Sequence, residues 1–334
     1  MNRRNVLKLG TLALPGLMLA ARGAHAQGAK KKISYAYLLD PAYDAVVWAI
    51  TNGKVKSDLI EIEARSLAIP QLLQATASKQ YDVIMTAVIG LPAAASRGLE
   101  LRILNTALQQ AKPGLGGGVW VKKDSPLQRP QDLKGKTMGS YSLRSTGYTQ
   151  VRIALQKKYG LNTALQGGDF KQLQIPASNL PAALARGSVD AATLIHSQAY
   201  KAIQSGEYRT IAETARDNIE MFKLRFISAV NVSYPEKLQA DAEAYMEFIR
   251  MFKASVQYAL SHRDEVFNAV SKKSGLDPKF FDWWFTNVAD VPGNFTREHA
   301  KSIDKFYELS AELGVLKKAV PVEPFLWDKL HMGA

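Results

Sequence analysis

Short runs of alternating hydrophobic and polar residues recur along the first third of the chain, and amphipathic stretches separate them. Alternation is typical of strands, whereas apolar residues three and four positions apart indicate helices. Up to residue 106, this pattern predicts strands at 32–38, 59–65, 81–86 and 101–106 and helices at 43–52, 69–79 and 91–97. Strands and helices that follow each other in turn predict a parallel sheet covered by helices.

The same alternation continues after a glycine-rich stretch at 114–118. Strands are predicted at 119–121, 137–140, 170–175, 190–195 and 225–232, and helices at 145–159, 179–186 and 198–205. From Pro235 onward the pattern is helical, with helices expected at 235–261, 262–274, 278–287 and 296–313. The expected fold class is therefore α/β, and a chain of 334 residues favours two domains.

One segment of the first half is echoed in the second half at a constant offset of 108 residues. In both copies an Ala-rich helix is followed by a tight turn and a strand that contains aspartate. The matching positions are Leu72, Ala75, Ala77 and Tyr81-Asp82-Val83 in the first copy and Leu180, Ala183, Ala185 and Val189-Asp190-Ala191 in the second. Two lobes built on one α/β plan would produce this echo, and so would a chance match between two Ala-rich helices.

The first 26 residues are typical of a secretory signal peptide. Arg3, Arg4 and Lys8 precede an apolar run at 9–21, and Ala24-His25-Ala26 has the small residues of a cleavage site after Ala26. The apolar run is too short to span a bilayer core of roughly 30 Å. The adjacent arginines resemble a twin-arginine export signal, and an ordinary secretory signal is the alternative. Either route exports the protein from the cytoplasm.

The charge and the cysteine count narrow the kinds of ligand and cofactor. The chain has no cysteine, which excludes disulfides, thiolate metal sites and cysteine nucleophiles. Its formal net charge is +13, and removal of the predicted signal peptide leaves 39 basic against 30 acidic residues. A basic field of this kind favours an anionic ligand or an acidic surface. Because the basic residues are scattered and the protein is expected outside the cytoplasm, no nucleic-acid partner is predicted.

Familiar nucleotide, hydrolase and metal motifs are absent from the sequence. Gly135-Lys136-Thr137 resembles the end of a phosphate-binding loop, but Pro130 stands where that motif needs glycine. Gly114 and Gly116 begin a dinucleotide fingerprint that Val119 breaks. There is no His-Glu-x-x-His, no Gly-x-Ser-x-Gly and no close histidine spacing for a metal. We therefore predict no cofactor, no metal and no catalytic residues.

Polar and aromatic residues gather instead in the loops that follow predicted strands. In open α/β sheets ligands bind outside the carboxyl ends of the strands, so these loops hold the candidate ligand-binding residues. Ser145 and Thr146 stand where a helix should begin, and the free N–H groups of a helix start attract an anion. A plain helix cap is the alternative interpretation of each hydroxyl. The candidate set is Tyr37, Asp40, Tyr43, Thr86, Ala87, Tyr141, Ser142, Arg144, Ser145, Thr146, Tyr148 and His196.

Several segments, taken in order, resemble a known family. Asp132-Leu133-Lys134-Gly135-Lys136, then Ser145-Thr146, then the run at 182–192 are similar to the nitrate/sulfonate/taurine type of periplasmic substrate-binding protein. Tyr81-Asp82-Val83 resembles a strand of that family's first lobe. Proteins of this type serve ATP-binding-cassette (ABC) importers. The resemblance covers roughly residues 32–235.

This resemblance implies a two-lobed type II periplasmic binding fold. Each lobe is expected to be a mixed, mostly parallel sheet flanked by helices, with a ligand held in the cleft between the lobes. Lobe one is expected at 32–117 with 233–334, lobe two at 118–232, and crossings near 117–121 and 226–232. The implied function is capture of a small organic anion in the periplasm and its delivery to the membrane permease of an ABC importer. The protein is expected to act as a monomer.

The chain departs from the family pattern in ways that leave the ligand open. Ile195-His196-Ser197 stands where relatives often have Trp and Pro, and the opening loop at 38–41 has few small hydroxyl residues. A sulfonate, a carboxylate, nitrate and a neutral pyrimidine are all left open, and the candidate tyrosines would enclose the ring of an aromatic ligand. His196 either touches the ligand or only makes a structural hydrogen bond. The competing hypothesis is an exported enzyme on the same fold. The thiamine-pyrimidine synthase relatives need a cysteine-rich motif that is absent here, so the enzyme left to consider is a hydrolase.

Overall fold

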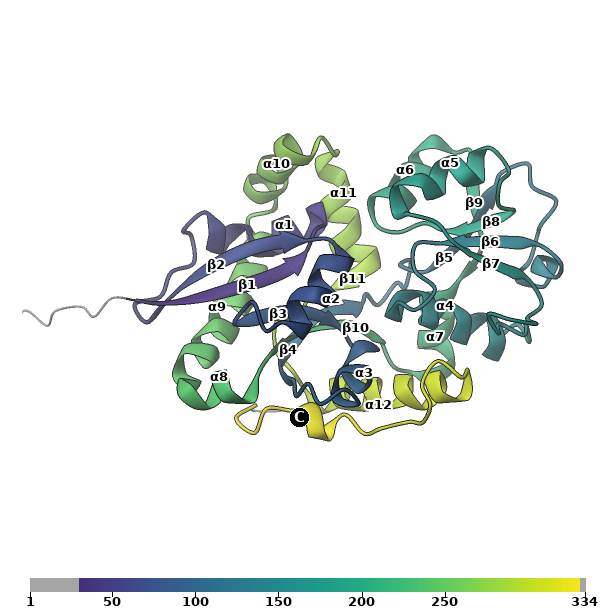
Figure 1. Ribbon diagram of the computed structural model, residues 1–334. Helices are drawn as coiled ribbons and strands as arrows, with labels where there is room; N and C mark the ends of the chain where they lie inside the picture. Colours follow the sequence, from purple (N-terminus) through teal and green to yellow (C-terminus); the bar gives the residue numbers. More distant parts are fainter. Residues whose placement is uncertain (1–29, 331–334) are drawn as a thin grey trace, which may run out of the picture.

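The computed structural model describes residues 30–330, which form two α/β units that lie side by side (Figure 1). We call them the six-stranded unit and the five-stranded unit, after the sheet that each contains. The predicted signal peptide at 1–26 lies outside the described residues. Among the described residues, no helix combines the length and the apolar character needed to cross a membrane.

The sheet of the six-stranded unit is mixed. Its strands are β1 (Lys31–Leu38), β2 (Ile60–Leu67), β3 (Val83–Ala87), β4 (Arg102–Gln110), β10 (Ile227–Ser233) and β11 (Ala289–Asp290), in the order β11-β4-β10-β3-β1-β2. β1 runs parallel to β2 and β3, as the alternating pattern predicted. β10 runs antiparallel between β3 and β4, so the four strands predicted within residues 32–106 all run in one direction, and the sheet is mixed and mostly parallel as expected. The local pattern could not show that β10 lies between them, because the whole five-stranded unit separates β4 from β10 along the chain.

The middle of the chain forms the sheet of the five-stranded unit. Its strands are β5 (Gly118–Lys122), β6 (Thr137–Ser140), β7 (Lys171–Gln174), β8 (Ala191–Thr193) and β9 (Tyr208–Glu213), in the order β7-β6-β8-β5-β9. The sequence pattern did not predict β9 or the helix that follows it, α7 (Thr214–Phe222). Most positions of β9 are half-buried, so its residues do not show the alternation from which a strand is recognised.

Both sheets share one strand plan. The order β4-β10-β3-β1-β2 corresponds to β9-β5-β8-β6-β7, with the same parallel and antiparallel pairs. The two aspartates of the sequence echo have equivalent roles. Asp82 Oδ2 accepts a hydrogen bond from the Ser34 N–H at 2.9 Å, and Asp190 Oδ2 accepts one from the Thr137 N–H at 2.8 Å. Each carboxylate joins the start of a central strand to its neighbour, which confirms the echo as a repeat of structure.

Helices flank both sheets, and most of them lie within the predicted segments. They are α1 (Pro41–Thr51), α2 (Ile69–Ala77), α3 (Gly90–Ala95), α4 (Thr146–Lys157), α5 (Leu180–Ala185), α6 (Ser197–Ser205), α8 (Pro235–Ala240), α9 (Ala242–Ser261), α10 (Arg263–Ser274), α11 (Pro278–Trp283) and α12 (Arg297–Glu312). The helix predicted at 235–261 is broken at Asp241, whose carboxylate caps α9 by accepting the Ala244 N–H at 3.1 Å. The helix predicted at 278–287 ends as a π-helical turn, η3 (Trp284–Val288).

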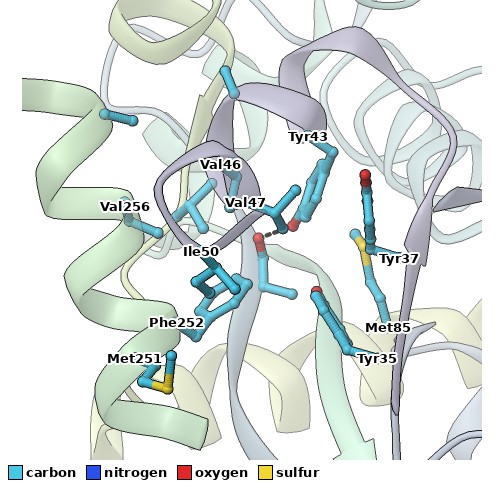
Figure 2. Close-up of a cluster of buried hydrophobic side chains, with 14 of the residues drawn as sticks. Tyr35, Tyr37, Tyr43, Val46, Val47, Ile50, Met85, Met251, Phe252 and Val256 are labelled. Carbon is cyan, nitrogen blue, oxygen red and sulfur yellow. Dashed lines mark hydrogen bonds between the residues drawn. The ribbon is translucent and has the colours of Figure 1, made fainter. Parts of the chain in front are cut away.

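The main core of the six-stranded unit lies between β1 and the helices α1 and α9. α1 buries Tyr43, Val46 and Ile50 on the side that faces Phe252 of α9, and Tyr35 of β1 lies beside them (Figure 2). The rings of Tyr35 and Phe252 meet edge to face with their centroids 6.0 Å apart. Because α1 begins directly after β1, this packing fixes the loop between them.

Residues 111–117 and 223–226 connect the units. A Cβ on Gly117 would lie 2.6 Å from Thr214 Oγ1, so glycine allows the first connection to pass close to α7. At Gly114 the φ angle is +67°, and a Cβ would lie 2.6 Å from the Arg216 backbone. α12 packs below both units in Figure 1, and its Glu312 forms an ion pair with Lys157 of α4.

Candidate functional site

Four loops lie where the two units meet, and each includes the carboxyl end of a strand. They are residues 38–41 at β1, 86–90 at β3, 140–147 at β6 and 194–197 after β8, and we call them the facing loops. The sequence analysis placed candidate ligand residues in all four. Two hydrogen bonds join the units here, one between Asp40 and His196 and one between Ile89 and Thr146.

The Asp40–His196 contact is a largely buried ion pair between the units. His196 Nδ1 lies 2.5 Å from Asp40 Oδ2, and the two side chains are only 16% and 13% exposed. Asp40 also caps α1, because its Oδ1 accepts the Ala42 N–H at 2.9 Å. Burial disfavours both charges, but the charge and hydrogen bond of His196 hold the pKa of Asp40 below its usual value. Asp40 in turn raises the pKa of His196 above its ordinary 6.5, against the opposing effect of burial.

The backbone at His196 is strained. Its φ and ψ angles are +46° and −116°, and the Gln198 N–H donates to the Ile195 carbonyl at 2.9 Å. These angles are those of the first central position of a type II′ turn, which glycine dominates. The imidazole packs edge to face on the Trp284 ring, with centroids 5.7 Å apart. The chain therefore has histidine at a position where this turn favours glycine, which has no side chain.

Thr146 makes the second hydrogen bond between the facing loops of the two units. Its Oγ1 accepts the Ile89 N–H at 3.3 Å, and its side chain is buried. Ser145 is the N-cap of α4, because its Oγ accepts the Tyr148 N–H at 3.2 Å. The helix start predicted at Ser145-Thr146 is therefore confirmed, and the Ser145 hydroxyl has the role of a plain cap.

The loop after β6 holds three further candidates. Arg144 is exposed, and among residues 30–330 no carboxylate lies within 4 Å of its guanidinium. Ser142 is half-buried, and its carbonyl accepts the Ser145 hydroxyl at 3.0 Å. A Cβ on Gly147 would lie 3.0 Å from the Tyr141 hydroxyl, so glycine lets this tyrosine approach the first turn of α4. Burial raises the pKa of Tyr141.

Thr86 and Ala87 are the last two residues of β3. Thr86 is buried opposite Val230 of β10, and Ala87 is half-buried opposite Ala229. They lie at the base of the loop that reaches Thr146 through Ile89.

Three candidate tyrosines have hydroxyl groups that are bonded within their own unit. The buried Tyr43 hydroxyl donates to the Ala107 carbonyl, which Figure 2 shows as a dashed line. The Tyr148 hydroxyl donates to Gln172 Oε1 at 2.7 Å, and the Tyr37 hydroxyl donates to Asp44 Oδ1 at 2.9 Å. Burial raises the pKa of all three hydroxyls. Of the four candidate tyrosines, only Tyr141 belongs to a facing loop.

Trp284 joins the site from a part of the chain that the sequence analysis had assigned only to a helix. Its fully buried ring contacts both Tyr43 and His196, at centroid distances of 6.4 and 5.7 Å. It begins the π-helical turn, a distortion that is frequent at functional sites. Its Nε1 is buried without a hydrogen-bond partner. The one sequence signal was the Trp283-Trp284 pair, which does not reveal a neighbour almost ninety residues away.

Two surface grooves each lie within one unit. One, of about 470 Å³, starts at the facing loop after β8, where Leu194 and Ser197 line it, and continues along α6 to Lys201. The other, of about 620 Å³, lies between α1, β2 and α10, where Lys273 pairs with Asp44. Within residues 30–330, no three His, Asp or Glu side chains gather as they would around a metal ion.

Comparison with protein families gives one match. The model of a family described as NMT1/THI5 like matches residues 66–266. That range includes three of the four facing loops. A comparison with curated proteins found no match.

Solved structures of periplasmic binding proteins are similar over almost the whole fold. SsuA from Escherichia coli, a periplasmic aliphatic sulphonate binding protein, is 16% identical with a TM-score of 0.71, covering 90% of this chain and 99% of that chain. The alkanesulfonate-binding protein SsuA from Xanthomonas axonopodis pv. citri, bound to MOPS, is 20% identical with a TM-score of 0.70, covering 90% and 98%. A conserved Candida albicans gene product with the generic periplasmic binding protein fold is 16% identical with a TM-score of 0.68, covering 91% and 98%. These likenesses confirm the predicted fold class, and with the family match they confirm the resemblance seen in the sequence.

Proposed function

We propose, from the premise that this chain belongs to the NMT1/THI5-like family, that it is an exported solute-binding protein of an ABC importer. It captures a small organic anion between its two units in the periplasm and delivers it, as a monomer, to a membrane permease. The observation that supports this most is the meeting of the facing loops, where Asp40 contacts His196 and Thr146 contacts Ile89 across the two units. Ligands of open α/β sheets bind at the carboxyl ends of strands, and here two such edges face each other.

The proposed ligand is an anion because of the groups on the loop after β6. Arg144 is exposed without an acidic partner in the described part of the chain, and α4 directs the positive end of its dipole toward this loop. The Ser142 and Tyr141 hydroxyls add donors, and the Thr86 hydroxyl lies at the end of β3 nearby. A sulfonate or a carboxylate accepts such hydrogen bonds and pairs with arginine. Two of the similar structures are sulfonate-binding proteins by name, which supports a sulfonate as the first ligand to test.

The two lobes are proposed at 32–117 with 233–334 and at 118–232. The connections at 111–117 and 223–226 would then act as the hinge about which the lobes close on the ligand.

Asp40 and His196 also have the arrangement of an orienting acid and a general base, which an exported hydrolase would need. A hydrolase would also need a nucleophilic hydroxyl group that donates a hydrogen bond to the second imidazole nitrogen, Nε2. Among residues 30–330, no hydroxyl group hydrogen-bonds to His196 Nε2. We therefore favour binding without catalysis, and turnover of a ligand is the outcome that would favour the hydrolase.

Thermal unfolding tests the proposal. The protein is unfolded and refolded to remove co-purified ligand, then heated with alkanesulfonates, MOPS, aliphatic and aromatic carboxylates, inorganic anions and pyrimidines. A ligand at about 1,000 times its Kd stabilises by about 4 kcal/mol, which raises Tm by several degrees. Arg144→Gln should reduce the shift, whereas Arg186→Gln, which changes an exposed arginine just after α5, should not. A panel with no shift at all would contradict the proposal.

A further inference from the structure

One ion pair joins the facing loops of the two units from positions 156 residues apart. Asp40 belongs to the six-stranded unit and His196 to the five-stranded unit, and both are largely buried at their junction. A second ion pair, between Lys157 of α4 and Glu312 of α12, also joins the units within residues 30–330, and its side chains are more exposed than those of Asp40 and His196. The Asp40–His196 pair therefore acts at the edge where the units would separate.

The strain at His196 shows that its side chain has a role beyond the turn. A residue other than glycine at these φ and ψ values is destabilised, and such outliers persist where the side chain or the backbone has a function. Here the imidazole contacts Asp40 of the other unit on one side and the Trp284 ring on the other. A structural turn without this contact would be more stable with glycine.

We propose that Asp40 and His196 form a protonation-sensitive clasp that holds the two units together without a ligand. This inference rests on the proposed function, because it describes how the lobes of a solute-binding protein close. A protonated imidazole attracts the Asp40 carboxylate, whereas a neutral imidazole keeps only a hydrogen bond to it. The closed form is then favoured in acid and relaxes as the solution becomes alkaline.

The direction of the pH effect follows from the two pKa shifts. The pKa of His196 is raised above 6.5 in the closed form, so its contribution to closure is complete below pH 6.5 and is lost as pH rises through the raised value. The pKa of Asp40 is lowered, so its contribution is present at and above its usual pKa and is lost only in stronger acid. Closure is therefore expected to be strongest in mildly acidic solution.

The carboxylates on α1 and α11 are engaged in other bonds, whereas Arg144 on the neighbouring facing loop has no acidic partner among residues 30–330. On α1, Tyr43 faces Asp40, but its pKa is raised well above 10, so it stays neutral across this window. Asp44 on α1 is bound to Tyr37 and Lys273. On α6, Lys201 lines the outer groove, and on α11, Asp282 is paired with Arg263. The pair itself therefore dominates the response of this junction to pH.

The clasp can be measured without any ligand. The chain has no cysteine, so Gln74→Cys on α2 and Gln204→Cys on α6 place one fluorophore on each unit at exposed positions. Energy transfer between them is recorded on the refolded, ligand-free full chain from pH 6 to pH 9. The closed-to-open ratio should fall with rising pH, by up to about tenfold per pH unit between 6.5 and the raised pKa of His196.

Two variants remove the clasp without disturbing the local fold. Asp40→Asn keeps a side chain that caps α1, and His196→Gly suits the strained turn. His196→Gly should give a more open protein whose energy transfer no longer depends on pH. Asp40→Asn should also open the protein, and because burial alone lowers the pKa of His196, any remaining pH response should run in the opposite direction, with closure favoured as pH rises. His262→Gln removes an exposed histidine at the junction of α9 and α10 and should leave the pH response unchanged.

Constant energy transfer from pH 6 to pH 9 in the unmodified chain would overturn the clasp, and so would a full pH response in His196→Gly. The thermal shifts with the ligand panel test the proposed function independently of the clasp. A protein that binds a panel ligand but shows no pH-dependent closure loses only the clasp. A protein with pH-dependent closure but no ligand in the panel loses only the proposed function.

Discussion

Replacing Glu213 by glutamine should stabilise the protein at pH 8 and leave it unchanged at pH 4. Glu213 ends β9 opposite Gly118, and its Oε2 is buried without a hydrogen-bond partner. Burial raises the pKa of this carboxyl from its ordinary 4.5 to about 7, although a hydrogen bond to Thr210 and the charge of Arg216 oppose the shift. The ionised form is therefore disfavoured in the folded protein.

The magnitude follows from that shift. A rise in pKa from 4.5 to about 7 corresponds to about 3.5 kcal/mol, at about 1.4 kcal/mol per pH unit. Because the folded pKa is the higher one, the penalty is absent below pH 4.5, grows as pH rises to 7 and is complete above. Glutamine keeps the shape of the side chain and carries no charge, so it should recover most of this free energy at pH 8.

Urea unfolding at pH 4, 6 and 8 measures the effect. The gain in unfolding free energy for Glu213→Gln should rise across this series, and Glu207→Gln, an exposed residue just before β9, should show no such trend. An equal gain at pH 4 and pH 8 would refute the reasoning. A loss of stability at pH 8 would also refute it, because it would mean that Arg216 outweighs burial.

Three further substitutions test the fold, each by chemical denaturation. Asp190→Ala removes the acceptor of the Thr137 N–H and should cost about 1–2 kcal/mol; no change would mean that the repeated aspartate does not stabilise the sheet. Gly117→Ala should cost about 1–3 kcal/mol, because its Cβ meets Thr214 Oγ1, and a neutral result would show that the connection has room to shift. Tyr43→Phe should cost about 1–3 kcal/mol by leaving the buried Ala107 carbonyl without its donor, and an unchanged midpoint would contradict that bond.

The sequence predicted much of this architecture because local patterns determine it. The strands and helices of residues 31–110 follow alternation and helical periodicity closely. The echo around Asp82 and Asp190 predicted two units on one plan. In both units the aspartate accepts a hydrogen bond from a backbone N–H of the neighbouring strand. Ser145 was placed correctly at a helix start, because capping depends on neighbouring residues alone.

Features that depend on distant contacts could not be predicted in this way. The insertion of β10 between β3 and β4 depends on where the chain returns after the five-stranded unit. Asp40 and His196 were separate candidates, but nothing in the sequence pairs two residues so far apart. Tyr43 was a candidate because it follows a strand, yet its hydroxyl bonds to the backbone of a distant strand, β4.

Isothermal titration calorimetry tests the central claim most directly, with the panel ligand that gives the largest thermal shift and with MOPS as the reference sulfonate. The account predicts saturable binding of one ligand per chain, recovery of the ligand unchanged, and affinity at least about tenfold lower in Arg144→Gln, since a charge-assisted hydrogen bond contributes more than 1.4 kcal/mol. Chemical conversion of the ligand, or no saturable binding by the refolded protein, would contradict it.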